Sequence, residues 1–273
     1  MVFQNFSPAN PLDKHIETIF YYKDFMPDHS IERVVPTGHI FLIFELDCFT
    51  RHTYNNDILK PNGSFTKVWI SGLHQNFLSI SAHENSEMLV IQFNHTGAYP
   101  FIHENVVKLT EKVLNAELVF GNPILELRQK IIESSEVNDK FKVVEKWLLG
   151  RFKESCQPSD EIVEMVSNIK QNAAIRITDL QNLYSKTHKQ LIFDFKKYVG
   201  INPKYFLRII RFNEILLKIH QKEKISWSTI SYECGYADQS HFIKDFKHFS
   251  GFNPEEFIKR DYNKDIPNFF PLD

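Results

Sequence analysis

A ten-residue motif that occurs twice constrains the fold of this chain more than any other feature. It reads DFKKYVGINP at positions 194–203 and DFKHFSGFNP at 245–254, so the two copies lie 51 residues apart. In each copy, apolar residues at helical spacing are followed by a glycine and then a proline, a pattern typical of one helix ending and another beginning. The chain therefore has to accommodate the same helix–glycine–helix unit twice.

Apolar periodicity around both copies predicts only helices from position 161 onward. Pro203 suits the first turn of a long helix between the copies, because the N–H that proline lacks has no helical partner there. A polar stretch at 157–160 is the expected linker, with Ser159 or Asp160 capping the next helix. The predicted helices are 161–172, 178–184, 187–199, 203–220, 226–234 and 239–249, and a short one starts at Pro254.

The second copy lies in a helix pair, 226–234 and 239–249, whose tight turn is that of a helix–turn–helix. Gly235 lies in this turn, and Asp238 is placed to cap the second helix. At 100° per residue, one stripe of that helix is apolar and must be buried: Phe242, Phe246 and Phe249. The opposite face is polar and cationic, and it carries Ser240, Lys244, Lys247 and His248, with His241 on its flank.

Such a face can read DNA, because lysine donates to guanine or phosphate and serine or glutamine bonds to base edges. The solvated face of an ordinary helical domain has the same appearance. The repeat favours DNA, since the helix between the copies spans ~27 Å at 1.5 Å per residue and successive major-groove faces lie ~34 Å apart. Net charge shifts in the same sense, from −4 over residues 1–159 (15 basic, 19 acidic) to +2 over 160–273 (17 basic, 15 acidic).

Residues 225–247, ISWSTISYECGYADQSHFIKDFK, followed by Gly251-Phe252-Asn253-Pro254, resemble the signature of the AraC family of transcription regulators. The resemblance covers about residues 160–262 and includes the turn glycine, the Ser-His-Phe step and the Gly-x-x-Pro ending. It implies that the second helix pair contacts bases or phosphates through Gln239, Ser240, His241 and Lys244, joined on the same face by Lys247. For His241 a second interpretation stays open, in which the ring packs on Tyr236.

The first helix pair departs from the family pattern. Gln181 stands where the family has a small alanine, Ser185 where glycine is common, and Phe193 where a basic residue is expected. Phe193 occupies the register of Lys244, which puts base reading by this pair in question, although its lysines could still hold phosphates. The expected DNA contacts of the first pair are Thr187, Lys189, Phe193, Lys196 and Lys197.

The N-terminal part has the pattern of short strands, as in a sandwich or small barrel. Strands are predicted at 39–46, 69–73, 77–81 and 88–94, and two amphipathic helices follow, with apolar positions Ile124, Leu127, Ile131 and Phe141, Val144, Leu148. Segments 31–44 and 93–101 are similar to a cupin-like sensor domain, which implies a barrel followed by a helical pair that often mediates dimerisation. The predicted fold is α+β, with a cupin-like sensor and dimerisation domain at 1–155 and an all-α tandem helix–turn–helix domain at 156–273.

An enzyme is the main alternative to a DNA-binding regulator. Four histidines, His74, His83, His95 and His103, invite a metal interpretation, but no His-x-His pair occurs, and Cys48, Cys156 and Cys234 are isolated. We therefore predict no metal, cofactor or catalytic residues. A cupin-type metal enzyme, an isomerase or oxygenase with a fused regulatory tail, is the competing hypothesis. A DNA-repair methyl acceptor would need a cysteine-rich zinc site that the sequence lacks.

The predicted function is sequence-specific binding of double-stranded DNA to regulate transcription, under the control of a small-molecule effector. A homodimer is expected, and RNA polymerase is a further candidate partner. No uncharged apolar run reaches the ~18 residues that span a membrane and no secretory signal is visible, so we expect a soluble cytoplasmic protein, associated with the bacterial nucleoid when bound. The effector, the operator, and the choice between activation and repression stay open.

Overall fold

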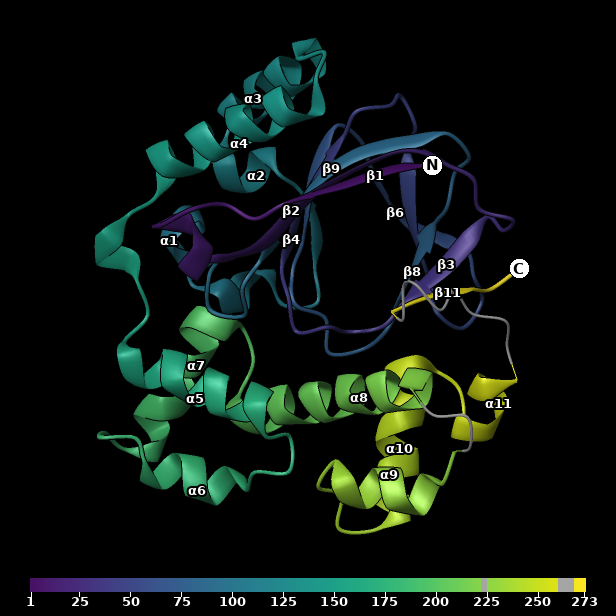
Figure 1. The fold of residues 1–273 in the computed structure, drawn as a ribbon, viewed down its shortest axis with the longest axis vertical. Helices are drawn as coiled ribbons and strands as arrows, with labels where there is room; N and C mark the ends of the chain where they lie inside the picture. The colour runs from purple at the N-terminus through teal and green to yellow at the C-terminus, as the bar shows by residue number, and fades with distance from the viewer. Residues whose placement is uncertain (222–224, 260–267) are drawn as a thin grey trace.

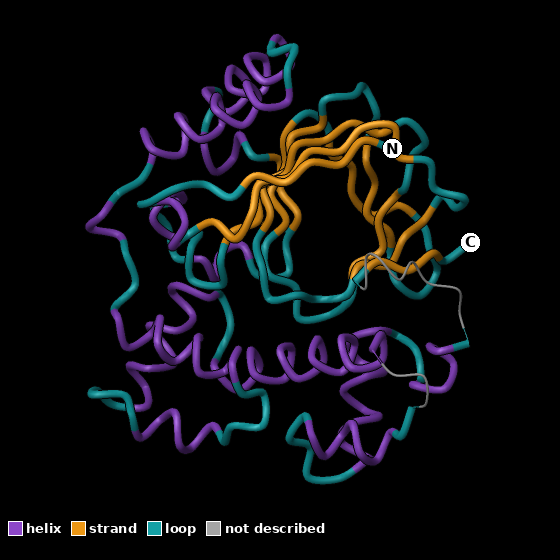
Figure 2. The backbone as a smooth tube through the Cα atoms, in the orientation of Figure 1, coloured by secondary structure: helices purple, strands orange, loops and turns teal. Residues whose placement is uncertain are grey.

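Two antiparallel sheets curve around a common interior and lie on a layer of helices in the computed structural model, which describes residues 1–221, 225–259 and 268–273 (Figure 1). The six-stranded sheet has the order β1 (Val2–Phe6), β2 (Ile16–Phe25), β9 (Ser86–Phe93), β4 (Phe41–Glu45), β7 (Val68–Ser71) and β10 (Val113–Asn115). The five-stranded sheet has the order β11 (Phe269–Pro271), β3 (Ile31–Val34), β8 (Leu78–Ser81), β5 (Arg51–Tyr54) and β6 (Pro61–Phe65). Figure 2 shows the strands of the two sheets curving around a common interior, which confirms the predicted barrel.

Successive side chains of a strand point to opposite faces of a sheet. Apolar side chains lie on both faces of the six-stranded sheet. On β9, Leu89 and Ile91 join the main core, whereas Met88 and Val90 belong to a second cluster with Trp69. Partly buried Phe65 of β6 packs against this second cluster, so that cluster lines the inside of the barrel. Strand β9 therefore contributes to the main core on one face and to the cluster inside the barrel on the other.

Helices α3 (Pro123–Glu133) and α4 (Val137–Arg151) cover the outer face of the six-stranded sheet (Figure 1). Phe141 of α4 stacks on Phe6 of β1 with ring centroids 5.3 Å apart, and Arg128 of α3 donates to the backbone carbonyl of Glu45 at 2.6 Å. The six apolar positions predicted for these helices are all buried. Short helical segments complete this half: η1 (Leu12–Lys14), α1 (Tyr99–Ile102), η2 (Val106–Leu109), α2 (Glu117–Phe120) and η3 (Glu154–Cys156).

The C-terminal helices agree with the prediction to within about two residues: α5 (Asp160–Gln171), α6 (Ile177–Asn182), α7 (His188–Val199), α8 (Pro203–Gln221), α9 (Trp227–Glu233), α10 (Gln239–Ser250) and α11 (Pro254–Ile258). The expectation of helices only from position 161 is wrong at one place. Residues 269–271 form β11, which pairs with β3 of the barrel. None of the helices in the described ranges is long and apolar enough to cross a membrane.

The long helix α8 packs on the barrel as well as on the helices around it. Phe206 of α8 is fully buried, and its ring centroid lies 5.1 Å from that of His95, just after β9. One hydrophobic core therefore runs from the strands through α8 to α10. The partition into domains at 1–155 and 156–273 stays a prediction. Strand β11 belongs to the second range by sequence but pairs with a strand of the first.

Candidate nucleic-acid interface

The two motif copies build the same helix twice. The N-terminal caps are equivalent: the Thr187 hydroxyl accepts from the backbone N–H of Gln190 at 3.2 Å, and the Asp238 carboxylate accepts from that of His241 at 2.9 Å. At the other end, Gly200 and Gly251 are left-handed, with φ of 99° and 77°. We call α6 with α7 the first helix pair and α9 with α10 the second helix pair.

Helix α10 buries the stripe that its sequence predicts. Phe242, Phe246 and Phe249 are each fully buried and pack against Phe212 of α8 and Trp227 of α9, with centroid distances of 5.3–6.0 Å. Five predicted DNA contacts are exposed on the other faces: Gln239, Ser240, His241, Lys244 and Lys247. Three of these lie in the first turn, the part of a recognition helix that contacts base edges.

His248 was expected on the outward face, and that expectation is wrong. The ring is partly buried, and its Nε2 lies 2.5 Å from the Tyr205 hydroxyl of α8. That hydroxyl also donates to the backbone carbonyl of Gln75 in the barrel half at 2.9 Å. His248 therefore belongs to the junction between the second helix pair and the barrel, and burial lowers its pKa.

His241 does not take the alternative role of packing on Tyr236. Its Nδ1 lies 2.7 Å from the Asp238 carboxylate, while the Tyr236 ring is buried against Phe242. The hydrogen bonds that Asp238 accepts from the backbone N–H and ring of His241 lower the pKa of that carboxyl. The imidazole is thus held at the exposed N-terminus of α10.

Helix α7 exposes an apolar side chain, Phe193, at the position where α10 exposes Lys244. Thr187, Lys189 and Lys196 are exposed, and the Phe193 side chain is 57% exposed although it is apolar. Lys197 is turned away from this face, since its ammonium lies 4.9 Å from the ring centroid of Tyr99 in α1 and 4.8 Å from that of Tyr198.

The turns of the two helix pairs have equal length, 183–187 and 234–238, but different backbones. Gly235 has φ of +79°, and a Cβ there would lie 2.6 Å from the backbone of Ala174. The equivalent residue in the first turn is Tyr184, one position before the Ser185 that the pattern suggested, and neither has a positive φ. Ser185 instead donates its N–H to Glu161 of α5 at 3.0 Å.

Polar contacts that sequence reasoning missed join α8 to the segment before the first helix pair and to the second helix pair. Arg208 of α8 donates to both carboxylate oxygens of Asp245 in α10, the shortest contact being 2.7 Å. Arg211 of α8 donates to the carbonyls of Ala173 and Ile175, which precede α6. The repeated aspartate of the motif, Asp194 and Asp245, was the available signal. Asp194 accepts from the Tyr184 hydroxyl at 2.7 Å.

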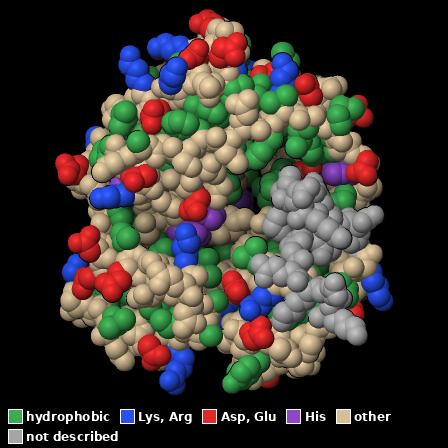
Figure 3. Space-filling view, in the orientation of Figure 1, with side chains coloured by type: hydrophobic (Ala, Val, Ile, Leu, Met, Phe, Trp, Pro, Cys, Tyr) green, Lys and Arg blue, Asp and Glu red, His purple; other side chains and the backbone are tan. Residues whose placement is uncertain are grey.

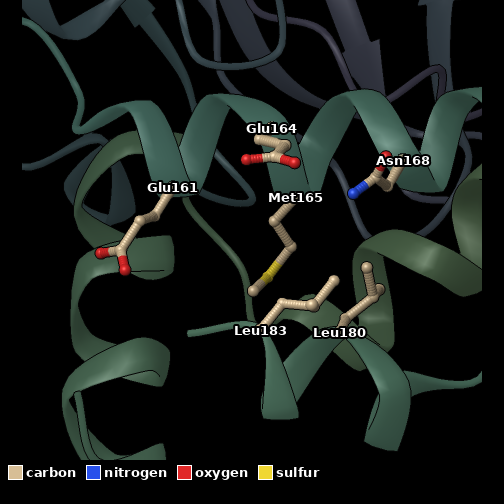
Figure 4. A pocket seen from close by; sticks show the side chains of 6 residues that line it. All are labelled: Glu161, Glu164, Met165, Asn168, Leu180 and Leu183. Carbon is tan, nitrogen blue, oxygen red and sulfur yellow. The ribbon is translucent and has the colours of Figure 1, made fainter. Parts of the chain in front are cut away.

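A groove lies between α5 and α6, the first helix of the first helix pair. Figure 4 shows Met165, Leu180 and Leu183 converging there, with Glu164 of α5 above them and Glu161 of α5 to one side. Met165 and Leu180 are buried, so the groove is a seam of helix packing with a carboxylate rim. Its acidic rim does not suit a phosphate backbone.

The inside of the barrel holds buried polar groups. Glu45 is fully buried and accepts from the Trp69 indole at 2.7 Å and from Arg51 at 2.9 Å, and burial raises its pKa to about 7. Beside α8, the rings of His39 and His95 lie 3.9 Å apart. Their buried nitrogens have no hydrogen-bond partner among the described residues, and burial lowers both pKa values, that of His39 to about 3.

Figure 3, in the same orientation as Figure 2, shows the surface hollowed at the centre of the barrel, with histidine side chains near it. His74 and His83 hydrogen-bond to serine hydroxyls, and His103 to two backbone carbonyls. Within residues 1–221, 225–259 and 268–273, no group of three or more histidine, cysteine, aspartate or glutamate side chains is arranged to hold a metal ion.

Comparison with known proteins agrees with this geometry. Residues 184–260 match the family described as "Helix-turn-helix domain", and residues 4–115 match a domain of unknown function. No curated protein matches the chain.

The solved structures to which the chain is similar include ToxT from Vibrio cholerae. One, bound to (E)-4-(8-methylnaphthalen-1-yl)but-3-enoic acid, is 15% identical, with 94% of this chain and 98% of that chain covered and a TM-score of 0.45. Another, bound to an unsaturated fatty acid, is 12% identical, with 88% and 94% covered and a TM-score of 0.45.

A probable AraC family transcriptional regulator from Rhodopseudomonas palustris is 20% identical, covers 37% of this chain and 96% of its own, and has a TM-score of 0.33. The matched helix–turn–helix residues, 184–260, include all of the second helix pair and the Gly251–Pro254 ending. Residues 184–260 of the chain therefore form a helix–turn–helix domain of the AraC type.

Proposed function

We propose that the second helix pair reads DNA sequence through the N-terminal end of α10, and that the first pair mainly contacts the backbone. The observation that carries this proposal is the exposed first turn of α10, with Gln239, Ser240 and His241 beside a capped helix N-terminus. Amide, hydroxyl and imidazole groups bond to base edges, and Lys244 and Lys247 on later turns suit guanine or phosphate. In α7, Thr187, Lys189 and Lys196 suit phosphates, whereas Phe193 offers no polar contact.

We propose that a small molecule bound inside the barrel controls DNA binding. Support comes from the hollow in Figure 3, the aromatic lining that includes Phe20, Phe41 and Trp69, and the unpartnered nitrogens of His39 and His95. An apolar pocket with a few polar groups is the usual form of a ligand site. Because His95 contacts Phe206 of α8, a ligand there would adjoin the helix that joins the two helix pairs.

The remaining parts of the proposal concern assembly and place of action. Exposed Ile132 of α3 and Leu149 of α4 suit a homodimer contact. Mutation of both to glutamate should leave a monomer by sedimentation, and an unchanged sedimentation coefficient would contradict this part. Action in the cytoplasm, at the nucleoid, and contact with RNA polymerase belong to the same proposal.

The test of DNA reading is selection of sequences from random duplexes by the full chain, with and without cell extract as an effector source. Selected duplexes should share a motif, and affinity should fall with salt at a log–log slope near −5 for about six neutralised phosphates. No enrichment at low salt, or an affinity independent of salt, would contradict DNA reading. Stoichiometric transition metal in the purified chain would instead favour the competing cupin-type enzyme, through His39 and His95.

A further inference from the structure

We propose that residues 268–273, here called the strap, act as an intramolecular latch that holds the second helix pair on the barrel and restrains its movement on DNA. The strap is far in sequence from the strand it joins. Strand β11 pairs antiparallel with β3, with Phe269 opposite Val34 and Pro271 opposite Glu32. Proline is tolerated there because β11 is the edge strand of its sheet.

Backbone and side-chain bonds hold the strap along its length. Val35 donates its N–H to the Asn268 carbonyl, and Leu272 donates to the Ile31 carbonyl, both at 3.0 Å. The Asp273 carboxylate accepts from the backbone N–H groups of Ser30 at 3.0 Å and Ile31 at 2.9 Å, and from the Ser30 hydroxyl. The strap is therefore docked by ordinary edge pairing, which is strong enough to order a segment and weak enough to open.

The docked strap also contacts the DNA-reading half. Phe270 is 3% exposed and packs on Phe257 of α11 at a centroid distance of 4.9 Å, and Phe257 packs on Phe246 of α10 at 5.1 Å. Asn268 donates to the side-chain oxygen of Asn213 in α8 at 2.9 Å. A continuous row of contacts thus leads from β3 through the strap to the core of α10.

The same strand β3 holds the far end of α10 directly. Arg33, opposite Phe270 in the pairing, donates to the Ser250 carbonyl at 3.0 Å. Its guanidinium lies 4.0 Å from the ring centroid of Phe77 and 4.6 Å from that of Phe252. The C-terminal end of α7 is held in a parallel way, by the Thr110 hydroxyl that donates to the Gly200 carbonyl at 2.8 Å.

Docking at both C-terminal ends leaves the N-terminal ends exposed but fixes the spacing of the two helix pairs. The 19 residues of α8 span about 28 Å, whereas one turn of DNA is about 34 Å. Both pairs can enter successive major grooves only if the DNA bends or one pair moves. The strap opposes movement of the second helix pair. Release of the strap should therefore favour binding of DNA by both pairs.

A reversible disulfide tests the latch in the full chain. Val34 and Phe269 lie between two hydrogen-bonded pairs of the ladder, in the closely spaced kind of pair that suits a disulfide. The variant is Val34→Cys/Phe269→Cys with exposed Cys48→Ser. A matched control, Val2→Cys/Lys23→Cys with Cys48→Ser, links β1 to β2 on the opposite sheet.

Oxidation of the strap variant should lower affinity for the selected duplex, on the order of tenfold, and reductant should restore it, while the control shows no change. Equal affinity and salt slope in the oxidised and reduced strap variant would overturn the latch. This inference rests on the proposed DNA reading, and the two fail differently. Absence of binding in every redox state contradicts DNA reading, whereas hydrogen exchange of α10 that is unaltered by oxidation contradicts the latch without any DNA.

Discussion

Phe193 and Lys244 occupy equivalent positions of two equivalent helices, yet one is apolar and the other cationic. Phe193 is 57% exposed, so the structure gives it no place in the core. Because Tyr184 also replaces the turn glycine, we expect the first helix pair to contact mainly the DNA backbone. Phe193→Ala should then change affinity little, and Phe193→Arg should keep or raise it by adding a phosphate contact. Fluorescence anisotropy with the selected duplex measures both, and a loss above about 2 kcal/mol for Phe193→Ala would indicate a base contact to a thymine methyl.

Lys244 and Lys247 are both exposed on α10 but lie on different turns. Lys244→Ala should weaken specific binding by roughly 1–3 kcal/mol if the ammonium bonds to a base, and should relax specificity at one position. Lys247→Ala should weaken binding to all duplexes about equally and lower the salt slope by about 1. Competition with selected and scrambled duplexes separates the two effects. Intact operator affinity in both variants would mean that α10 does not read DNA.

At the scale of elements, the sequence predicts the helices better than the strands. The helices have local signals, such as Thr187 and Asp238 at N-caps and Gly200 and Gly251 at C-terminal ends. The strand β2 breaks its alternation with register shifts between Ile16 and Thr18 and between Tyr22 and Phe25, so no clean period remains. The segment 61–65 reads as a turn, PNGSF, and is a strand only because β5 pairs with it. β1, β3, β5, β10 and β11 are likewise not predicted.

The caps permit a prediction about helix α7. Thr187→Ala removes the side-chain acceptor for the Gln190 N–H, so the free energy of unfolding should fall by about 1 kcal/mol. Thr187→Ser keeps a hydroxyl at the same place and should unfold near the wild-type midpoint. Urea titration followed by circular dichroism compares the three proteins. An alanine variant as stable as the serine variant would show that the cap contributes nothing to α7.

At the scale of the whole molecule, the sequence predicts which face of α10 is outward but not what the barrel covers. Local periodicity places Gln239, Ser240, His241 and Lys244 correctly, since their exposure depends on α10 alone. Lys197 and His248 differ because their partners, Tyr99 and Tyr205, lie 98 and 43 residues away in sequence. The docking of the strap cannot be predicted from local sequence for the same reason, because β3 precedes the strap by more than 230 residues.

The junction of barrel and α8 should also make the whole protein less stable as pH falls. Burial lowers the pKa of His39 to about 3 and that of neighbouring His95, and the positive charge of Lys170 acts in the same direction. Between pH 6.5, near the pKa of a free histidine, and pH 4, the unfolded chain takes up protons at these sites and the folded chain does not. Stability therefore falls with pH by up to about 1.4 kcal/mol per pH unit for each site.

The measurement is the urea midpoint from pH 8 to pH 4 for the wild type and for His39→Gln, a side chain that stays neutral throughout. The variant should lose less stability between pH 6.5 and 4 than the wild type. His29 supplies a control of opposite sign: burial lowers its pKa, but hydrogen bonds to Asp28 and Glu32 raise it more. The stability contributed by protonated His29 is present at low pH and is lost as pH rises. His29→Gln should therefore make the free energy of unfolding fall more steeply as pH is lowered. Parallel pH profiles for wild type and His39→Gln would show that His39 is free to take up a proton in the folded protein.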